Sequence, residues 1–193
     1  MISTSTPGTH HHLTFRRNIF WSGEAWGLCL SGLPNMAAEN NTFATIKWYG
    51  FGNKGGQGGS AVNNIFFDIT TPYTTGPGFV GKGNLVFNCR EAPQGAGPGE
   101  FSEGDPKFAD AEKGNLRLTA GSAAIDAGVD GLDIGALDYP NVYSVDPAHP
   151  GASDEGFGYA GWPFKTLAKA LSAAAEGETI VLRGGTYRES VKV

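Results

Sequence analysis

Four aromatic side chains are the first candidates for binding chemistry in this chain of 193 residues. The apolar faces of sugar rings pack well against aromatic rings, and tryptophan and tyrosine add a polar group at the ring edge. A platform for carbohydrate is therefore one hypothesis, and core packing or a contact between molecules are its alternatives. The four ligand-binding candidates are Trp21, Trp26, Trp48 and Tyr49.

Ionisable groups are sparse in residues 13–88, where a catalytic centre would need them together. No two of the carboxylates there fall at equivalent positions of the sequence repeat described below. The cations that would serve as bases, Arg16, Arg17 and Lys47, fit a solvated strand face better. We therefore predict no catalytic residues. The carboxylates of this stretch are Glu24, Glu39 and Asp68.

Further along the chain, aspartates gather in glycine-rich segments, where crowded oxygen ligands would suit calcium. Their spacing matches no EF-hand loop, and aspartate in such segments commonly caps turns. Calcium is thus a candidate without a predicted ligand set. The histidines at 10–12 do not form a metal site in a strand, because neighbouring side chains point to opposite faces. The aspartates are Asp126, Asp130, Asp133, Asp138, Asp146 and Asp154.

A short signature, asparagine followed two residues later by phenylalanine, recurs every 23 residues and organises the chain. A repeat of this length is typical of a solenoid, in which each unit buries its apolar face against its neighbours. Residues 84–87 are interpreted as a fourth copy, shortened by a residue or two and shifted by one. The three regular copies are Asn18–Phe20, Asn41–Phe43 and Asn64–Phe66.

Side chains alternate along a strand, so the asparagine and phenylalanine columns both point inward in this interpretation. The asparagines then form a structural hydrogen-bonded ladder and the phenylalanines fill the core. The β-branched column between them, Ile19, Thr42 and Ile65, points outward. The predicted structural ladder consists of Asn18, Asn41, Asn64, Phe20, Phe43 and Phe66.

The composition agrees with many short segments and limits the partners. Thirty glycines and eleven prolines punctuate a chain of strands and turns. The six glycines of residues 50–60 predict a loop, and residues 94–104 mark the end of the regular coils. A net charge of −5 argues against nucleic acid. No apolar run is long enough to span a membrane, and Cys29 and Cys89 are either free thiols or a single bridge.

The segment after the repeats resembles the C-terminal end of secreted right-handed parallel β-helix proteins of the pectate-lyase-like superfamily. The resemblance implies an all-β solenoid, a right-handed parallel β-helix of about four or five coils. It covers residues 13–139, with the repeats included. The motifs that carry it are Asp105–Phe108, Asn115–Leu118, Gly121–Gly128 and Asp133–Ala136.

The last part of the chain resembles the N-terminal start of the same superfamily, with a short amphipathic capping α-helix. The helix is predicted over residues 164–176, with Pro163 in its first turn and Gly177 after its end. Its apolar face consists of Phe164, Leu167, Ala168, Leu171 and Ala175. Thr179–Leu182 is predicted to be a buried strand. The motifs are Tyr143–Pro147, Asp154–Gly156, Trp162–Leu167, Gly177–Leu182 and Gly184–Tyr187.

The end motif therefore precedes the start motif, which divides the chain into coils (1–117), a closing segment (118–142) and a cap with a first coil (143–193). Tandem β-helix domains, a circular permutation and end-to-end stacking of copies would each give this order. In the last two cases Thr179–Val193 would lie on Leu13–Phe20, in the same chain or in another copy. The partners that we expect are thus other copies of the chain, and no nucleic acid or membrane.

The leading hypothesis for function is a non-catalytic extracellular building block that stacks end to end and contacts polysaccharide. Residues 1–12 are polar and carry no signal peptide, so secretion or a place at the cell surface is implied by the resemblance alone. The alternatives are a carbohydrate-binding module and a polysaccharide lyase or hydrolase for uronic-acid polymers. Lyases of the superfamily use a basic side chain, often beside calcium that acidic residues hold on adjacent coils.

Overall fold

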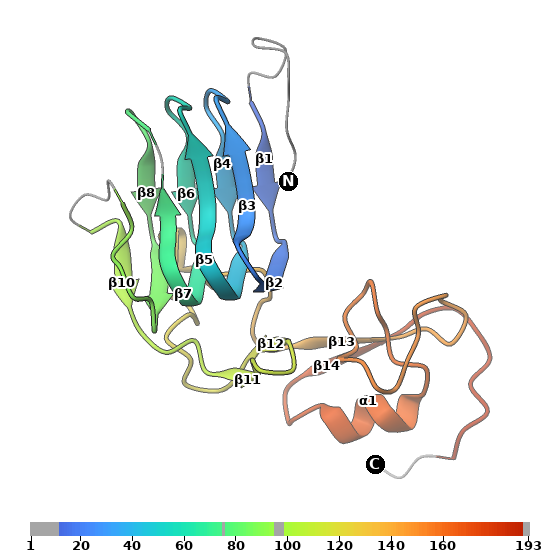
Figure 1. The fold of residues 1–193 in the computed structure, drawn as a ribbon. Coiled ribbons are helices and arrows are strands. Elements are labelled where there is room, and N and C mark those ends of the chain that lie inside the picture. Colours follow the sequence, from blue (N-terminus) through green and yellow to red (C-terminus); the bar gives the residue numbers. More distant parts are fainter. Residues whose placement is uncertain (1–11, 75, 95–98, 191–193) are drawn as a thin grey trace. The chain divides into compact units, whose positions relative to one another are not determined.

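The computed structural model describes residues 12–74, 76–94 and 99–190. The chain divides into two compact units, residues 1–138 and 139–193, and each is described by itself. The first unit is a parallel β-solenoid of about three turns, fewer than the four or five coils expected. Its strands lie side by side in Figure 1, and the last two, β11 and β12, form a separate hairpin.

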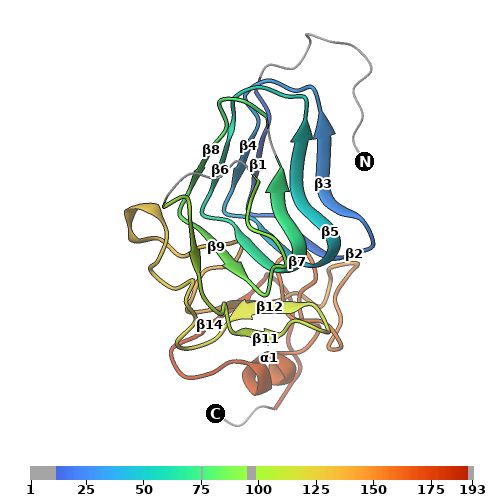
Figure 2. The same ribbon diagram turned by 60° about the vertical axis from the view of Figure 1, so that its left-hand side comes forward.

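Two parallel sheets form the wall of the solenoid and face each other across its core (Figure 2). One sheet has the order β1-β4-β6-β8, and the other has the order β10-β9-β7-β5-β2, with β3 also paired to β5. The short strands of the first sheet are β1 (Thr14–Arg16), β4 (Ala37–Glu39), β6 (Ser60–Val62) and β8 (Val80–Lys82). The strands of the second are β2 (Ile19–Gly23), β3 (Trp26–Ser31), β5 (Thr42–Lys54), β7 (Ile65–Thr74), β9 (Asn84–Phe87) and β10 (Phe101–Glu103).

Two bends in each coil are made by single residues with positive φ, a conformation that glycine, asparagine and aspartate adopt more readily than other residues. The first bend comes directly before each asparagine of the repeat, and the second comes four residues after it. Because the bends recur in register, the coils stack with the same cross-section. The first column is Arg17, Asn40, Asn63 and Gly83, with φ of 54°, 50°, 54° and 61°; the second is Ser22, Thr45, Asp68 and Asn88, with φ of 57°, 55°, 54° and 54°.

The asparagines of the repeat form a continuous hydrogen-bonded ladder along the solenoid. The backbone N–H and the Nδ2 of Asn41 both donate to Oδ1 of Asn64, at 2.9 and 3.0 Å. Asn64 makes the same pair of bonds to Asn84, and Asn18 makes them to Asn41. The side-chain amide of each asparagine after Asn18 also donates to a carbonyl of the preceding coil, as Asn64 does to Ala38 at 2.8 Å. The buried polar groups of this turn are thereby paired, which their burial requires.

The phenylalanine column fills the core beside this ladder. The rings of Phe20, Phe43 and Phe66 stack with centroids 4.7 and 5.1 Å apart. In the fourth copy, Val86 takes the core position, because Leu85 pairs with Ile65 and Val86 with Phe66. The expected shift by one residue is therefore wrong, and the copy is three residues shorter.

The glycine-rich stretch after Tyr49 is not simply a loop, because β5 continues through Gly50 and Gly52 to Lys54. A Cβ on Gly50 would lie 2.8 Å from the Phe66 ring, so glycine is needed where the strand crosses the stacked rings. A Cβ on Gly52 would lie 2.4 Å from the indole of Trp26. The prediction missed this strand because glycine here serves close packing and not a turn.

The β-branched column lies on the side of the strands away from the phenylalanine core, but it is buried, because the closing segment covers it. Thr42 and Ile65 are 2% and 1% exposed. Ala136 donates its N–H to Oγ1 of Thr42 at 3.0 Å, and Gly135, with φ of 102°, allows the backbone to approach Ile65. The closing segment contains the 3₁₀-helix η1 (Val129–Gly131), and the antiparallel hairpin of β11 (Phe108–Asp110) and β12 (Asn115–Leu118) precedes it.

The last coil of the solenoid is terminated by Glu100. Its main-chain carbonyl accepts the N–H of Asn84 at 3.3 Å, in the place of a fifth asparagine. Its carboxylate accepts the N–H of Gly81 at 3.1 Å and the hydroxyl of Tyr73 at 3.3 Å. Burial, and next the charge of Glu100, raise the pKa of Tyr73 above its ordinary value. Glu100 thus pairs backbone groups of both sheets at this end, at Gly81 of β8 and Asn84 of β9, which lowers the cost of an unprotected strand edge.

The second unit holds two parallel strands and one helix, β13 (Val142–Val145), α1 (Leu167–Ala173) and β14 (Thr179–Leu182). The helix is shorter than predicted, because Thr166 caps its first turn and Ala174 already has extended φ and ψ. Its buried residue is Ala170, whereas Ala168 and Ala175 of the predicted face are exposed. Strand β14 is also less buried than expected, with Leu182 47% exposed.

The docking of Thr179–Leu182 bears directly on the order of the chain. The strand pairs with Val142–Val145 of its own unit, with Tyr143 opposite Ile180. Both a circular permutation and end-to-end stacking need the other edge of this strand to pair with Leu13–Phe20. Two rungs of a second stack are therefore assembled within residues 139–193.

Candidate functional site

The second column of bends lines a shallow hollow of about 340 Å³ on the outside of the first unit. It runs across all four copies of the repeat, because each copy contributes the bend residue and the residue two places later. The hollow, called the bend trough below, is polar and open to solvent. Its polar and charged lining residues are Ser22, Glu24, Thr45, Lys47, Asp68, Thr70, Asn88 and Arg90.

The charges of the bend trough are two carboxylates and two cations. Lys47 Nζ lies 3.8 Å from Glu24, in an exposed and therefore weak ion pair. Oδ1 of Asp68 accepts a hydrogen bond from Nδ2 of Asn88 at 3.0 Å, which joins two neighbouring coils. Thr70 donates its hydroxyl to the carbonyl of Lys47 at 2.8 Å. The trough thus presents rows of hydroxyl, amide and charged groups, whose hydrogen bonds named above join them to one another and to the strand backbone.

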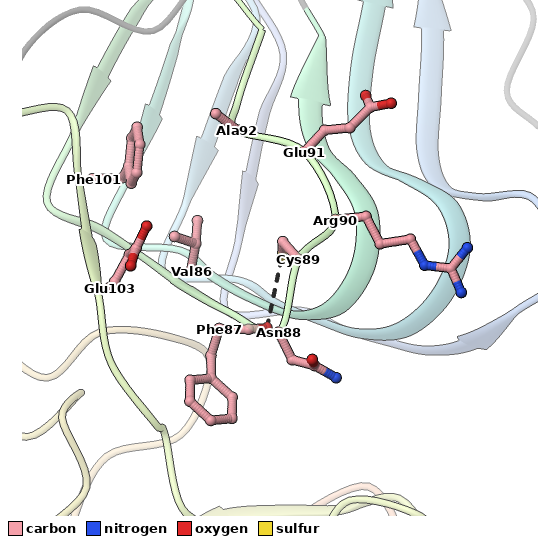
Figure 3. Close-up of a pocket in the computed structure, with 9 residues that line it drawn as sticks. All are labelled: Val86, Phe87, Asn88, Cys89, Arg90, Glu91, Ala92, Phe101 and Glu103. Carbon is pink, nitrogen blue, oxygen red and sulfur yellow. Dashed lines mark hydrogen bonds between the residues drawn. The ribbon is translucent and has the colours of Figure 1, made fainter.

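A second hollow, of about 430 Å³, lies at the closed end of the solenoid (Figure 3). Val86 and Phe101 provide apolar surface there, while the guanidinium of Arg90 points away from the strand that carries Glu103. Arg90 and Asn88 line both hollows, so this second hollow adjoins the bend trough.

Cys89, also in the end hollow, is a free thiol, as is Cys29, so the bridge considered from the sequence is absent. Its Sγ donates to the carbonyl of Phe66 at 3.4 Å, and Figure 3 marks its contact with Phe87. Burial raises the pKa of the thiol to about 11. A thiol that stays protonated at neutral pH is a poor nucleophile, so Cys89 has a packing role.

The structure does not bring the four aromatic candidates together as one platform. Trp26 stacks on Tyr49, with ring centroids 4.1 Å apart and planes 18° from parallel. Trp21 contacts the turn between β11 and β12, because its Nε1 donates to the carbonyl of Ala111 at 2.9 Å and its ring lies over Gly114. Trp48 is 51% exposed. Trp26, Tyr49 and Trp48 therefore remain candidates for contact with a ligand.

The basic residues named from the sequence lie apart from one another. Arg16 pairs with Glu39 of the next coil, and Arg17 pairs with Asp138 at 2.6 Å. Of the three, Lys47 alone lies in the bend trough, together with Asp68. Arg90, which the sequence did not single out, joins them. Its signal was its position six residues after the asparagine of its coil, which is the position of Lys47 and Glu24.

The aspartates considered for calcium serve several local contacts. Oδ1 of Asp133 accepts the N–H of Asp126 at 2.8 Å, and Oδ1 of Asp154 accepts the N–H groups of Lys165 and Thr166. Within the described ranges there is no group of three or more histidine, cysteine or acidic residues placed to hold a metal ion. His10 and His11 lie outside the described residues, and His12 is exposed.

No family model matches the chain, and no curated protein or solved structure is significantly similar to it. Among the residues that the structure describes, no helix has the length and apolar character needed to cross a membrane.

Proposed function

We propose that the first unit is a non-catalytic extracellular module that holds a polysaccharide segment in the bend trough. One observation carries this proposal: polar residues recur in each copy of the repeat, in an open hollow that runs across all four copies. Parallel strands are about 4.8 Å apart, which is comparable to the advance per sugar along a polysaccharide. A ligand with a repeating unit can then make a similar contact at each coil.

The lining suits a sugar polymer that carries carboxylates. The serine, threonine, asparagine and aspartate of the bend column offer donors and acceptors for sugar hydroxyls. Lys47 and Arg90 provide positive charge, and a guanidinium binds a carboxylate through two parallel hydrogen bonds. We therefore assign uronic-acid-containing polysaccharide as the ligand class.

The resemblance noted in the sequence supports the same class and an extracellular place. The closing motif of residues 105–136 and the starting motif of residues 143–187 resemble those of secreted pectate-lyase-like proteins, which are right-handed parallel β-helices. The parallel solenoid with stacked asparagines and phenylalanines agrees with that architecture. In this proposal the coils are right-handed and the protein acts outside the cell.

Affinity electrophoresis of the full chain through gels that contain uronic-acid polymers or neutral polysaccharides tests the proposal. We expect retardation by an acidic polymer, and a loss of about tenfold in affinity for Arg90→Ala, since about 1.4 kcal/mol corresponds to tenfold. The matched control is Lys54→Ala, an exposed cation on β5 outside the lining of the trough. Equal retardation of both variants, or none of the wild type, would refute a site in the trough.

The aromatic pair is tested separately in the same gels. Trp26→Ala and Tyr49→Ala remove the stacked rings without touching the charged trough. If these variants are no longer retarded while Arg90→Ala still is, the binding surface is the ring pair and not the trough.

A lyase is the second candidate, because Lys47, Arg90 and Asp68 line one hollow. A basic side chain there would remove the proton beside a sugar carboxylate, and a cation would neutralise that carboxylate. Incubation with the polymer that binds best, followed by the ultraviolet absorbance of unsaturated ends, decides between the two. If the wild type forms this product and Lys47→Ala or Arg90→Ala does not, the protein is a lyase and not a binding module.

A further inference from the structure

The solenoid of the first unit has an unfinished coil at the end where β1, β2 and β3 lie. These strands are at the sheet edges, since β1 pairs with β4 and both β2 and β3 pair with β5. The Nδ2 of Asn41 reaches Phe15 one coil before, but the Nδ2 of Asn18 turns to Arg16 in its own coil, at 3.1 Å. Among the described residues, the first rung thus lacks the coil that would precede it.

The second unit contains two rungs of the same type, and among its described residues β14 pairs with β13 on one edge alone. Nδ2 of Asn141 donates to the Glu178 carboxylate, as the Nδ2 of Asn18 does to Oδ1 of Asn41. The N–H of Thr179 donates to the carbonyl of Asn141 at 3.0 Å. The equivalent bond in the first unit joins Thr42 to Asn18 at 2.9 Å.

The core columns correspond in the same register. Tyr143 lies opposite Ile180 in the second unit, and Phe20 lies opposite Phe43 in the first. Tyr143 is 7% exposed and packs in a cluster with Phe164, which Ile180 borders. Residues 141–143 and 178–180 therefore repeat the pattern of residues 18–20 and 41–43 in hydrogen bonding and in core position.

We infer that the free edge of β14 in one copy of the chain pairs in parallel with the free edge of β2 in another copy. The register follows from the ladder, with Thr179 opposite Ile19 and Ile180 opposite Phe20. Glu178 would then accept the N–H of Ile19 at its main-chain carbonyl, as Asn18 accepts that of Thr42. Phe20, which is half-buried, would gain an apolar neighbour on its open side.

The contact joins two different surfaces, so each copy still offers one free edge after pairing. A heterologous contact that does not close gives linear assemblies whose length depends on concentration. The inferred contact does not involve the end at Glu100, where the carboxylate of Glu100 accepts the N–H of Gly81 and its carbonyl accepts that of Asn84. The inference concerns association between copies and is independent of any ligand in the bend trough.

Proline substitutions can block each edge without removing a bond inside the chain, because alternate N–H groups of an edge strand point away from its partner. Ile19→Pro acts on β2, since the equivalent Thr42 N–H points to the preceding coil. Leu182→Pro acts on β14, because its neighbour Arg183 donates its N–H to Val145 on the paired side. Ile19→Val is the control that keeps the N–H.

Sedimentation velocity of the full chain over a wide concentration range measures the association. We expect growing species for the wild type and for Ile19→Val, and monomers for each proline variant alone. An equimolar mixture of Ile19→Pro and Leu182→Pro should give a dimer and nothing larger, since one variant retains β14 and the other retains β2. Circular dichroism checks that each variant folds.

A wild type that stays monomeric at all concentrations would overturn the inference. So would proline variants that assemble like the wild type, or a mixture of the two that remains monomeric although both are folded.

Discussion

The two ends of the solenoid in the first unit are completed in different ways. At the end of β10, Glu100 supplies a carbonyl to Asn84 and a carboxylate to Gly81, and Asn84 is fully buried. At the end of β2, Asn18 is exposed, and besides its bond to Asn41 its amide donates to Arg16 of its own coil and not to a preceding coil. The same asparagine rung is thus a buried structural member at one end and an accessible edge at the other.

Removal of the terminal amides should separate the two ends most clearly. Asn84→Ala deletes the acceptor of two buried donors on Asn64 and a donor to Ala61, at 3.0, 3.0 and 2.8 Å. Buried groups left unpaired cost about 1–3 kcal/mol each, so we expect a loss of about 3 kcal/mol or more. Asn18→Ala should cost less than about 1 kcal/mol, because water reaches its neighbours.

Urea denaturation of the two variants, followed by circular dichroism, gives both free energies of unfolding. Equal losses would mean that the exposed rung is as fully integrated as the buried one, and the contrast between the ends would fail. Asn84→Asp is a companion variant that keeps the acceptor, loses the donor to Ala61 and Glu100, and adds a buried carboxyl group.

Substitution of Glu100, which ends the last coil, gives the next largest expected effect. Glu100→Ala leaves the Gly81 N–H and the Tyr73 hydroxyl without their acceptor, and we expect a loss of about 2 kcal/mol. Glu103→Ala changes an exposed carboxylate on the same strand and should cost within about 0.5 kcal/mol. Thermal melts of both variants provide the comparison. A Glu100→Ala variant as stable as Glu103→Ala would show that the carboxylate of Glu100 does not stabilise this end.

The sequence predicts the regular part of the first unit well, because equivalent residues have equivalent surroundings. Asn41 and Asn64 each face one rung above and one below, so the 23-residue interval alone places them in one column. The parallel solenoid follows from the same interval. The bend trough was hidden, although Ser22, Thr45 and Asp68 share that interval, since their backbone conformation and not their type makes them a column.

The irregular parts were predicted less well, because contacts distant in the sequence decide them. The burial of Thr42 and Ile65 depends on Gly135 and Ala136, which lie some seventy to ninety-four residues further along the chain. The helix of the second unit ends early, although the apolar pattern continues to Ala175. Its buried side is set by packing of Ala170 near Tyr143 and Phe164, which local periodicity does not specify.

The smallest effect that distinguishes the ends is expected at high pH. Burial and Glu100 raise the pKa of Tyr73 above 10.0, its ordinary value, in the folded chain. The folded state therefore keeps the proton that the unfolded chain releases, so this contribution is full below about pH 10 and is lost as the pH rises further. Tyr73→Phe should remove part of the decline in the free energy of unfolding between pH 9 and about pH 11, where each pH unit is worth at most about 1.4 kcal/mol for one group. Glu100→Gln should weaken the decline without abolishing it, since burial is the larger cause. Denaturant titrations across this range measure the slope of the free energy of unfolding against pH. An unchanged slope in Tyr73→Phe would show that Tyr73 does not contribute to the loss of stability at high pH.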